Sequence, residues 1–235
     1  MSTYVLRGVM SHVDFLGDAS NAPGVQGRAE PIQRRSTARL SGLLDAAASV
    51  VDEVGFDRIT TAMIAERAGA SIGTVYRYYP DRVAVLTALH ERAVSRLRQR
   101  VTEELATNEP ETWWDAVDGA ITACVGLYRS EPGFRILNFA YREAPIAGED
   151  ADLESASFAR QMAAAFAKEF DLPHGPELTF RLEVAVELAD ALLSRAFQVD
   201  PQGDERFIAE CRRVLHAYLV SFYGPSVPLT FDAES

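Results

Sequence analysis

The chain has 235 residues, of which 48% are hydrophobic and 24% are charged, so it is too apolar to be intrinsically disordered and long enough for one or two ordinary cores. No run of eighteen apolar residues occurs, and the first ten residues lack the basic start and long apolar block of a secretory signal. These features exclude a membrane-spanning helix, and we expect a cytoplasmic protein with no membrane contact. Two cysteines without metal-ligand spacing, Cys124 and Cys211, predict unpaired thiols.

The net charge of -11 is unevenly distributed along the chain. Residues 31–100 carry 11 arginines and 7 acidic residues, whereas residues 101–235 carry 10 basic and 24 acidic residues. Because charge acts through surfaces, an acidic protein of this kind can present a positive N-terminal part to DNA while its acidic remainder repels DNA.

Residues 1–33 contain scattered glycines and prolines with no sustained period, which predicts a flexible extension. From Arg34, apolar residues recur at helical spacing until Gly55, which is expected to end the helix. The arginines at its start, Arg34, Arg35 and Arg39, form either a solvated fringe or an arm that contacts phosphates and the minor groove.

The segment from Thr60 to Arg82, TTAMIAERAGASIGTVYRYYPDR, predicts two short helices joined by a tight turn. Thr60 or Thr61 can cap the first helix, and Gly69 ends it, because glycine enters the left-handed region without a Cβ penalty. Ser71 caps the second helix and Pro80 stops it.

The second short helix combines small, hydroxylated and phenolic residues with arginine on its exposed side. Such groups suit phosphate oxygens and base edges, and small residues allow close approach of another surface. This pattern is typical of a recognition helix. The alternative is a surface helical hairpin in which Tyr76 and Tyr79 pack on neighbouring residues.

From about Arg35 to Leu89 the chain resembles the helix-turn-helix of the TetR family of transcriptional repressors. The resemblance rests on a GF pair at Gly55, on T-x-x-x-I-A-x-x-A-G ending at Gly69, and on S-x-G-T-x-Y-x-Y-Y-x-x-R ending at Arg82. Two departures are Tyr78-Tyr79 in place of the common His-Phe pair and Arg82 in place of the common Lys. The resemblance and the residue chemistry together predict these DNA contacts: Arg35, Thr61, Ser71, Ile72, Gly73, Thr74, Tyr76, Arg77, Tyr78 and Arg82.

The rest of the chain also reads as helical. A long helix is expected from Asp81 to Asn108, followed by helices over about 111–129, 134–143, 150–170, 177–199 and 203–223. The predicted fold is all-α, with about nine helices and no strand. We expect a three-helix DNA-binding domain at 34–80, a helical ligand-binding and dimerisation domain at 81–224, and a tail at 225–235.

Large apolar side chains are concentrated in the middle of the second domain, where they either fill the core or line a cavity for an apolar ligand. The resemblance favours the cavity, because TetR-like regulators generally carry an inducer site in this part. The candidate pocket residues are Trp113, Trp114, Tyr128, Phe134, Phe139, Tyr141, Phe158, Met162 and Phe166.

The last two helices have apolar surfaces too broad for one partner helix. Alanines at helical spacing permit close helix approach, so two such helices per chain can form a four-helix interface across a two-fold axis. The first set of candidate dimer residues is Leu182, Ala185, Ala189, Leu192, Ala196, Val214, Leu215 and Tyr218. A second stripe on the helix over 177–199 contains Val184, Leu188, Ala191 and Phe197.

Enzymatic chemistry has little support in the sequence. The four histidines form no Glu-x-x-His pair, and neither a phosphate-binding loop nor a nucleophile motif occurs, so we expect no catalytic residue, metal or cofactor. The leading prediction is a homodimeric repressor that binds a palindromic DNA operator and is released by a small apolar ligand. The alternative is a DNA-organising or protein-interaction module with the same DNA-binding head and no small-molecule inducer.

Overall fold

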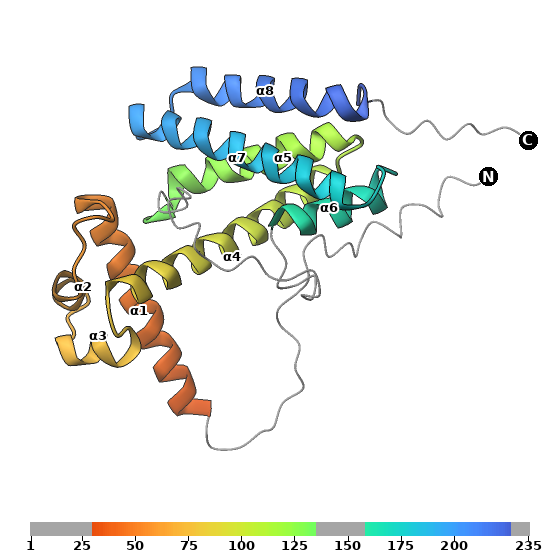
Figure 1. Cartoon of the computed structure of the whole chain (residues 1–235). Coiled ribbons are helices and arrows are strands. Elements are labelled where there is room, and N and C mark those ends of the chain that lie inside the picture. Colours follow the sequence, from red (N-terminus) through yellow and green to blue (C-terminus); the bar gives the residue numbers. More distant parts are fainter. Residues whose placement is uncertain (1–29, 135–157, 227–235) are drawn as a thin grey trace, which may run out of the picture. The chain divides into compact units, whose positions relative to one another are not determined.

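The computed structural model describes residues 30–134 and 158–226, without the side chains of residues 30–36. Every regular element among these residues is a helix, which confirms the all-α prediction (Figure 1). The described residues form eight helices: α1 Glu30–Val54, α2 Thr61–Arg67, α3 Ile72–Tyr78, α4 Arg82–Asn108, α5 Trp113–Ser130, α6 Phe158–Glu169, α7 Pro176–Val199 and α8 Glu205–Tyr223. The additional helix expected over 134–143 falls almost entirely outside the described residues.

The observed helix ends follow the stop signals of the sequence closely. Gly55, directly after α1, and Gly69, directly after the C-cap Ala68 of α2, adopt positive φ values of 82° and 59°. The one larger difference is the start of α1, which begins at Glu30 rather than Arg34, so the last four residues of the expected extension are helical. Nothing in residues 30–33 opposes helix except Pro31, which is tolerated in a first helical turn.

The chain forms two compact units, and each is described by itself. The head comprises the described residues 30–97 and 126–134, and the body comprises 98–125 and 158–226. Two helices contribute to both units: α4 passes from the head into the body at residue 98, and α5 passes from the body into the head at residue 126.

The core of the head holds the short helices in place. Ile64 of α2, Val75 of α3 and Leu86 of α4 are fully buried, together with Ala47 of α1. Helices of seven residues have little stability of their own and depend on packing, which two buried side chains of α2, Ile64 and Ala65, and one of α3, Val75, provide. The opposite side of α3 therefore stays free of packing constraints.

The body is built around α7, which packs against both α6 and α8. Phe166, Leu178 and Ile208 from these three helices are almost completely buried. Helix α8 also contacts α5: Arg212 Nε donates to Asp118 Oδ1 at 2.6 Å, and the His216 ring lies 4.6 Å from the Trp114 ring. Both α7 and α5 thus pack beside α8 in the body (Figure 1).

Within the described residues no helix is both long enough and apolar enough to cross a membrane. Over the same residues, no cluster of three or more His, Cys, Asp or Glu side chains could hold a metal ion.

Candidate functional site

The turn between α2 and α3 is fixed by local hydrogen bonds. Thr60, not Thr61, is the N-cap of α2, and its hydroxyl accepts from Met63 N at 3.2 Å. Ser71 caps α3 in the same way, accepting from Thr74 N at 3.2 Å. Each cap satisfies an N–H group that the helix leaves unpaired, so both short helices start at defined residues.

One face of α3 is open to solvent. Val75 is fully buried and anchors the helix, whereas Ile72 is 48% and Tyr76 is 50% exposed. Gly73 and Arg77 are exposed as well. These four residues occupy positions i, i+1, i+4 and i+5 of the helix, so they share one face. The open face of α3, consisting of Ile72, Gly73, Tyr76 and Arg77, is the candidate interface.

Gly73 lies in ordinary helical backbone on this face. A Cβ atom added there would have no neighbour closer than Ser71 Oγ, at 3.9 Å. Neither backbone conformation nor internal packing therefore requires glycine, although glycine in a helix costs roughly 0.5–1 kcal/mol relative to alanine. Gly42 of α1 is equally open, so openness alone does not mark a site. Gly73 differs because large side chains flank it on the same face.

The hydroxyl groups near the open face are already partly engaged. Ser71 Oγ and Thr74 Oγ1 are 2.9 Å apart, and Thr61 Oγ1 donates to the Tyr76 hydroxyl at 3.2 Å. The second bond ties the start of α2 to α3 and orients the Tyr76 phenol, which keeps its own proton to donate outward. Thr74 and Tyr78 are half-buried at the edge of the face.

Arg82 has a structural partner that the sequence did not reveal. One of its terminal nitrogens donates to the Asp57 carbonyl at 2.7 Å and fastens the start of α4 to the loop after α1. A guanidinium group has five N–H donors, so this bond leaves others for an external phosphate.

The predicted DNA contacts of Thr61, Ser71, Thr74, Tyr78 and Arg82 stay predictions. The side chain of Arg35 lies outside the described residues.

An exposed ion pair joins α1 to α2. Arg67 lies 2.5 Å from Glu53, and the hydrogen bond from this guanidinium lowers the pKa of Glu53 below its usual value. Because both groups are solvent-exposed, the pair is worth little as a source of stability. It nevertheless fixes where the first helix of the turn sits on α1.

The residues predicted to line a ligand pocket are divided between the two units. Trp113, Met162 and Phe166 are buried in the body and Trp114 is half-buried there. Tyr128 and Phe134 are buried in the head, where their rings meet edge to face at 5.1 Å. Phe158 begins α6, and Phe139 and Tyr141 fall outside the described residues. The pocket remains a prediction for the body residues, while Tyr128 and Phe134 form part of the core of the head.

The residues predicted for a dimer interface also separate into two groups. Leu182, Ala185, Ala196 and Leu215 are at most 4% exposed in the single chain, so they pack inside it and cannot form a surface. Ala189, Leu192, Val214 and Tyr218 are half-exposed. The error arose because both stripes of α7 are apolar, and the sequence does not indicate which one packs against the chain's own core.

The second stripe of α7 is accessible too, except for Phe197, which is buried. Val184 and Leu188 are half-exposed and Ala191 is exposed. On α8 the corresponding residues are Phe207, Val214, Tyr218 and Phe222, spaced by seven and four residues and half-exposed or exposed. The guanidinium carbon of Arg181 lies 4.0 Å from the centre of the Phe222 ring and joins the two stripes. We call these residues of α7 and α8 the open stripe of the body.

Both cysteines carry free thiols, as the sequence predicted. Burial raises the pKa of Cys211 to about 11 and raises the pKa of Cys124 further, with Asp190 adding to the effect at Cys124. Thiols of this kind stay protonated and unreactive near neutral pH.

Two family models match separate parts of the chain. Residues 43–89 match the model described as bacterial regulatory proteins of the tetR family, and residues 111–223 match the tetracyclin repressor-like C-terminal domain. The first match contains α2, α3 and the open face of α3.

Three known proteins illustrate the likeness. The crystal structure of a TetR-family transcriptional regulator from Streptomyces coelicolor is 33% identical, with a TM-score of 0.65, over 78% of this chain and 98% of that one. The HTH-type transcriptional regulator BetI of Klebsiella pneumoniae is 37% identical over 76 residues, which are 32% of this chain and 36% of that protein. The nucleoid occlusion factor SlmA of Haemophilus influenzae is 32% identical over 81 residues, 34% of this chain and 36% of that protein.

The matches to the two curated relatives span only about a third of their length, whereas the Streptomyces structure is matched along nearly its whole chain. That match combines sequence identity above 30% with a shared fold across head and body. The chain therefore belongs to the TetR family of helix-turn-helix transcriptional regulators.

Proposed function

We propose that this protein is a repressor that binds a palindromic operator as a homodimer, and that the open face of α3 reads the base edges in the major groove. The observation that carries this proposal is the composition of that face. Ile72, Tyr76 and Arg77 project from a helix whose other side is buried, and Gly73 leaves a gap between them. An apolar side chain suits a thymine methyl group, and a guanidinium suits guanine or phosphate.

The open stripe of the body supports the homodimer. It extends along both α7 and α8, which pack together, and it exposes aromatic side chains such as Phe222 at 46%. Two copies related by a two-fold axis bury such a stripe against itself, since an isologous interface uses the same surface twice. A dimer then carries two heads, which suits a palindrome with half-sites about one helical turn apart.

A small apolar effector is the third part of the proposal. We assign its site to apolar side chains of the body, of which Trp114 is half-buried and Trp113, Met162 and Phe166 are buried. We infer repression rather than activation from the tetracyclin repressor-like description of the matched C-terminal domain. The family is one of DNA-binding regulators, so an enzymatic role is not proposed, and the proposed repressor acts in the cytoplasm.

The competing proposal is a DNA-organising module whose body binds a protein. The likeness to a nucleoid occlusion factor favours this alternative, but that match covers only a third of this chain. Loss of operator binding on addition of an apolar compound separates the two functions, because only the repressor requires it.

The testing experiment is selection of duplex DNA from a random pool by the full-length protein at physiological salt. Recovery of a palindrome with two similar half-sites supports the proposal, and binding of the palindrome should be at least about a thousandfold tighter than that of a scrambled duplex. Recovery of no enriched sequence overturns sequence-specific repression.

A further inference from the structure

The turn that follows α5 lies directly on α1. The backbone N–H of Gly133 donates to Asp52 Oδ2 at 3.0 Å. A Cβ atom added to Gly133 would lie 2.8 Å from the Cβ and 2.9 Å from the Cα of Ala48, closer than real Cβ atoms approach. Gly133 also has a φ of 74°, which favours glycine. Contact between the turn and α1 therefore requires glycine at 133 and a small residue at 48.

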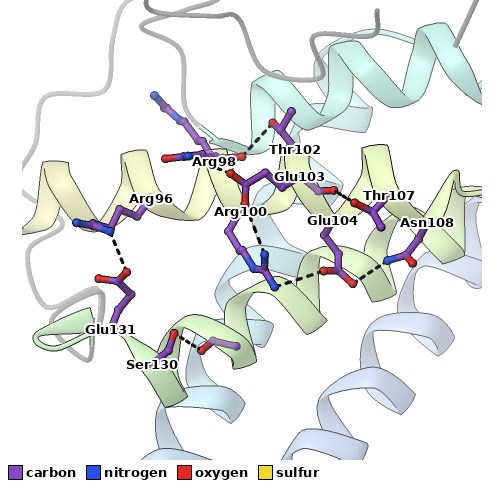
Figure 2. Close-up of polar contacts among 12 residues, drawn as sticks. Arg96, Arg98, Arg100, Thr102, Glu103, Glu104, Thr107, Asn108, Ser130 and Glu131 are labelled. Carbon is purple, nitrogen blue, oxygen red and sulfur yellow. Dashed lines mark hydrogen bonds and ion pairs between the residues drawn. The ribbon is translucent and has the colours of Figure 1, made fainter. Parts of the chain in front are cut away.

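The same turn is bound to α4. Figure 2 shows Arg96 of α4 reaching toward Glu131, and the guanidinium nitrogen lies 2.8 Å from the carboxylate oxygen. Close to this bond, Leu89 and Ala93 of α4 line a shallow hollow together with Pro132 and Gly133. Glu131 and Gly133 thus contact two different helices of the head.

Helices α4 and α1 also contact each other directly. Arg92 of α4 donates from one nitrogen to Asp45 Oδ1 at 2.6 Å and from the other to the Leu44 carbonyl at 3.2 Å. Asp45, Ala48 and Asp52 follow each other at helical spacing along one side of α1, and Arg92 and Arg96 are one turn apart on α4. Each of these three segments, the turn, α1 and α4, is therefore bonded to the other two.

The turn also has a position in the chain that suits regulation. It directly follows α5, whose first residues, Trp113–Val125, belong to the body. The helix that the turn contacts, α1, also contacts α2: Arg67 of α2 pairs with Glu53 of α1, and Ile64 of α2 is buried in the core of the head. The chain therefore provides a second covalent route from body to head besides α4, and this route ends on the helix that supports the DNA-binding turn.

We propose that residues Glu131–Gly133 form a latch on α1 and α4, and that the seated latch favours the DNA-binding arrangement of the head while an effector in the body unseats it. This inference rests on the proposed function. A tight contact between backbone and Ala48 has no intermediate positions, so it is either made or broken, which suits a two-state device. Seating the latch fixes α1 relative to α4, and α2 and α3 then meet DNA without further ordering.

The first test uses Asp52→Ala and Asp52→Asn with the selected palindromic duplex. Both variants remove one negative charge, but only asparagine keeps an oxygen that can accept from Gly133 N. We expect alanine to weaken operator binding about five- to tenfold and asparagine to stay within about twofold of wild type. If alanine and asparagine bind equally, the hydrogen bond plays no part in DNA binding and the latch is wrong.

The second test compares Gly133→Ala with Gly224→Ala. Both glycines have a φ of 74°, but an added Cβ at Gly224 meets no atom within 4 Å. The two variants therefore share an unfavourable positive φ, and only Gly133→Ala disturbs the contact with Ala48. Weaker operator binding for Gly133→Ala alone supports the latch, and equal binding by both variants overturns it.

A measurement on the wild-type protein removes any dependence on how the variants fold. Operator DNA should slow hydrogen exchange of the Gly133 amide at least about threefold, because coupling between the latch and DNA acts in both directions. Unchanged exchange in a protein saturated with operator overturns the latch and leaves the proposed function intact. A wild-type protein that selects no duplex overturns both.

Discussion

The head and the body are both helical and both bury alanine, leucine and valine, but they differ in what they leave exposed. The head exposes one short face with an isoleucine, a glycine, a tyrosine and an arginine, four residues of four different chemistries. The body exposes a long stripe of similar apolar residues on α7 and α8. A surface that must distinguish sequences requires varied groups at fixed positions, whereas a surface that binds its own copy requires mainly area and shape.

This difference makes the body the place where a single charge should have the largest effect. Replacing the half-exposed Leu188 by glutamate puts a charge into the open stripe, and burying an unpaired charge costs several kcal/mol. We expect Leu188→Glu to be a monomer by light scattering at micromolar concentration and to lose at least about a hundredfold in operator affinity, because one head reads only a half-site.

The control for this variant is Ala106→Glu, which adds the same charge at an exposed position of α4. It should leave both the mass and the operator affinity unchanged. A wild-type mass equal to that of one chain would contradict the dimer before any variant is made.

The head should respond to smaller, local changes. Tyr76→Ala and Arg77→Ala each remove one group from the open face, and we expect each to weaken operator binding by about 1–3 kcal/mol. Arg77→Ala should leave the melting temperature unchanged, because this side chain is exposed, whereas Tyr76→Ala also loses the hydrogen bond from Thr61. Arg82→Ala should weaken binding and also destabilise the head, since it breaks the bond to the Asp57 carbonyl. Titrations at several salt concentrations and a thermal melt of each variant provide both quantities.

Equal operator affinity of the Tyr76 and Arg77 variants and wild type at physiological salt would show that α3 does not face DNA. Tyr76→Phe is the finer variant, because it keeps the ring and loses only the hydroxyl that binds Thr61.

The sequence predicted the head in detail because its signals are local. Gly55, Gly69, Ser71 and Pro80 mark helix ends through backbone conformation and capping, which depend on neighbours in the chain. The same signals could not show that the turn at Gly133 lies on α1, because this contact joins residues 81 positions apart. Glu131-Pro132-Gly133 reads only as a helix break in the sequence.

The body was harder to predict for a related reason. An apolar stripe indicates that a helix is covered, but not whether the cover is another helix of the same chain, a second copy or a ligand. For this reason the sequence predicts Leu182 and Leu215 for the dimer interface, although they are buried within the single chain. Burial of individual residues distinguishes these cases, and periodicity does not.

The smallest expected effect concerns pH and is confined to the head. Burial lowers the pKa of His90 on α4, although the neighbouring Glu91 acts in the opposite direction. The folded state therefore binds a proton at His90 less readily than the unfolded state does. Above pH ~6.5 His90 does not lower the free energy of unfolding, and below that value it lowers this free energy as the pH falls. His90→Gln should lose less stability than wild type between pH ~7.5 and ~5.5 in urea titrations. Equal losses in the two proteins would show that His90 does not contribute.

Gly73→Ala tests most directly the claim that the open face of α3 meets DNA. Alanine should stabilise the protein by at most roughly 0.5–1 kcal/mol, the value for a helix interior, because Gly73 lies in the first turn of α3 and the added methyl meets no protein atom closer than 3.9 Å. The same methyl should clash with DNA and weaken operator binding by about 1–3 kcal/mol. Gly42→Ala, at an equally open position of α1, should give the stability gain alone. The decisive measurement is the operator affinity of Gly73→Ala beside its unfolding free energy: the account predicts higher stability with weaker binding, and higher stability with unchanged binding would contradict it.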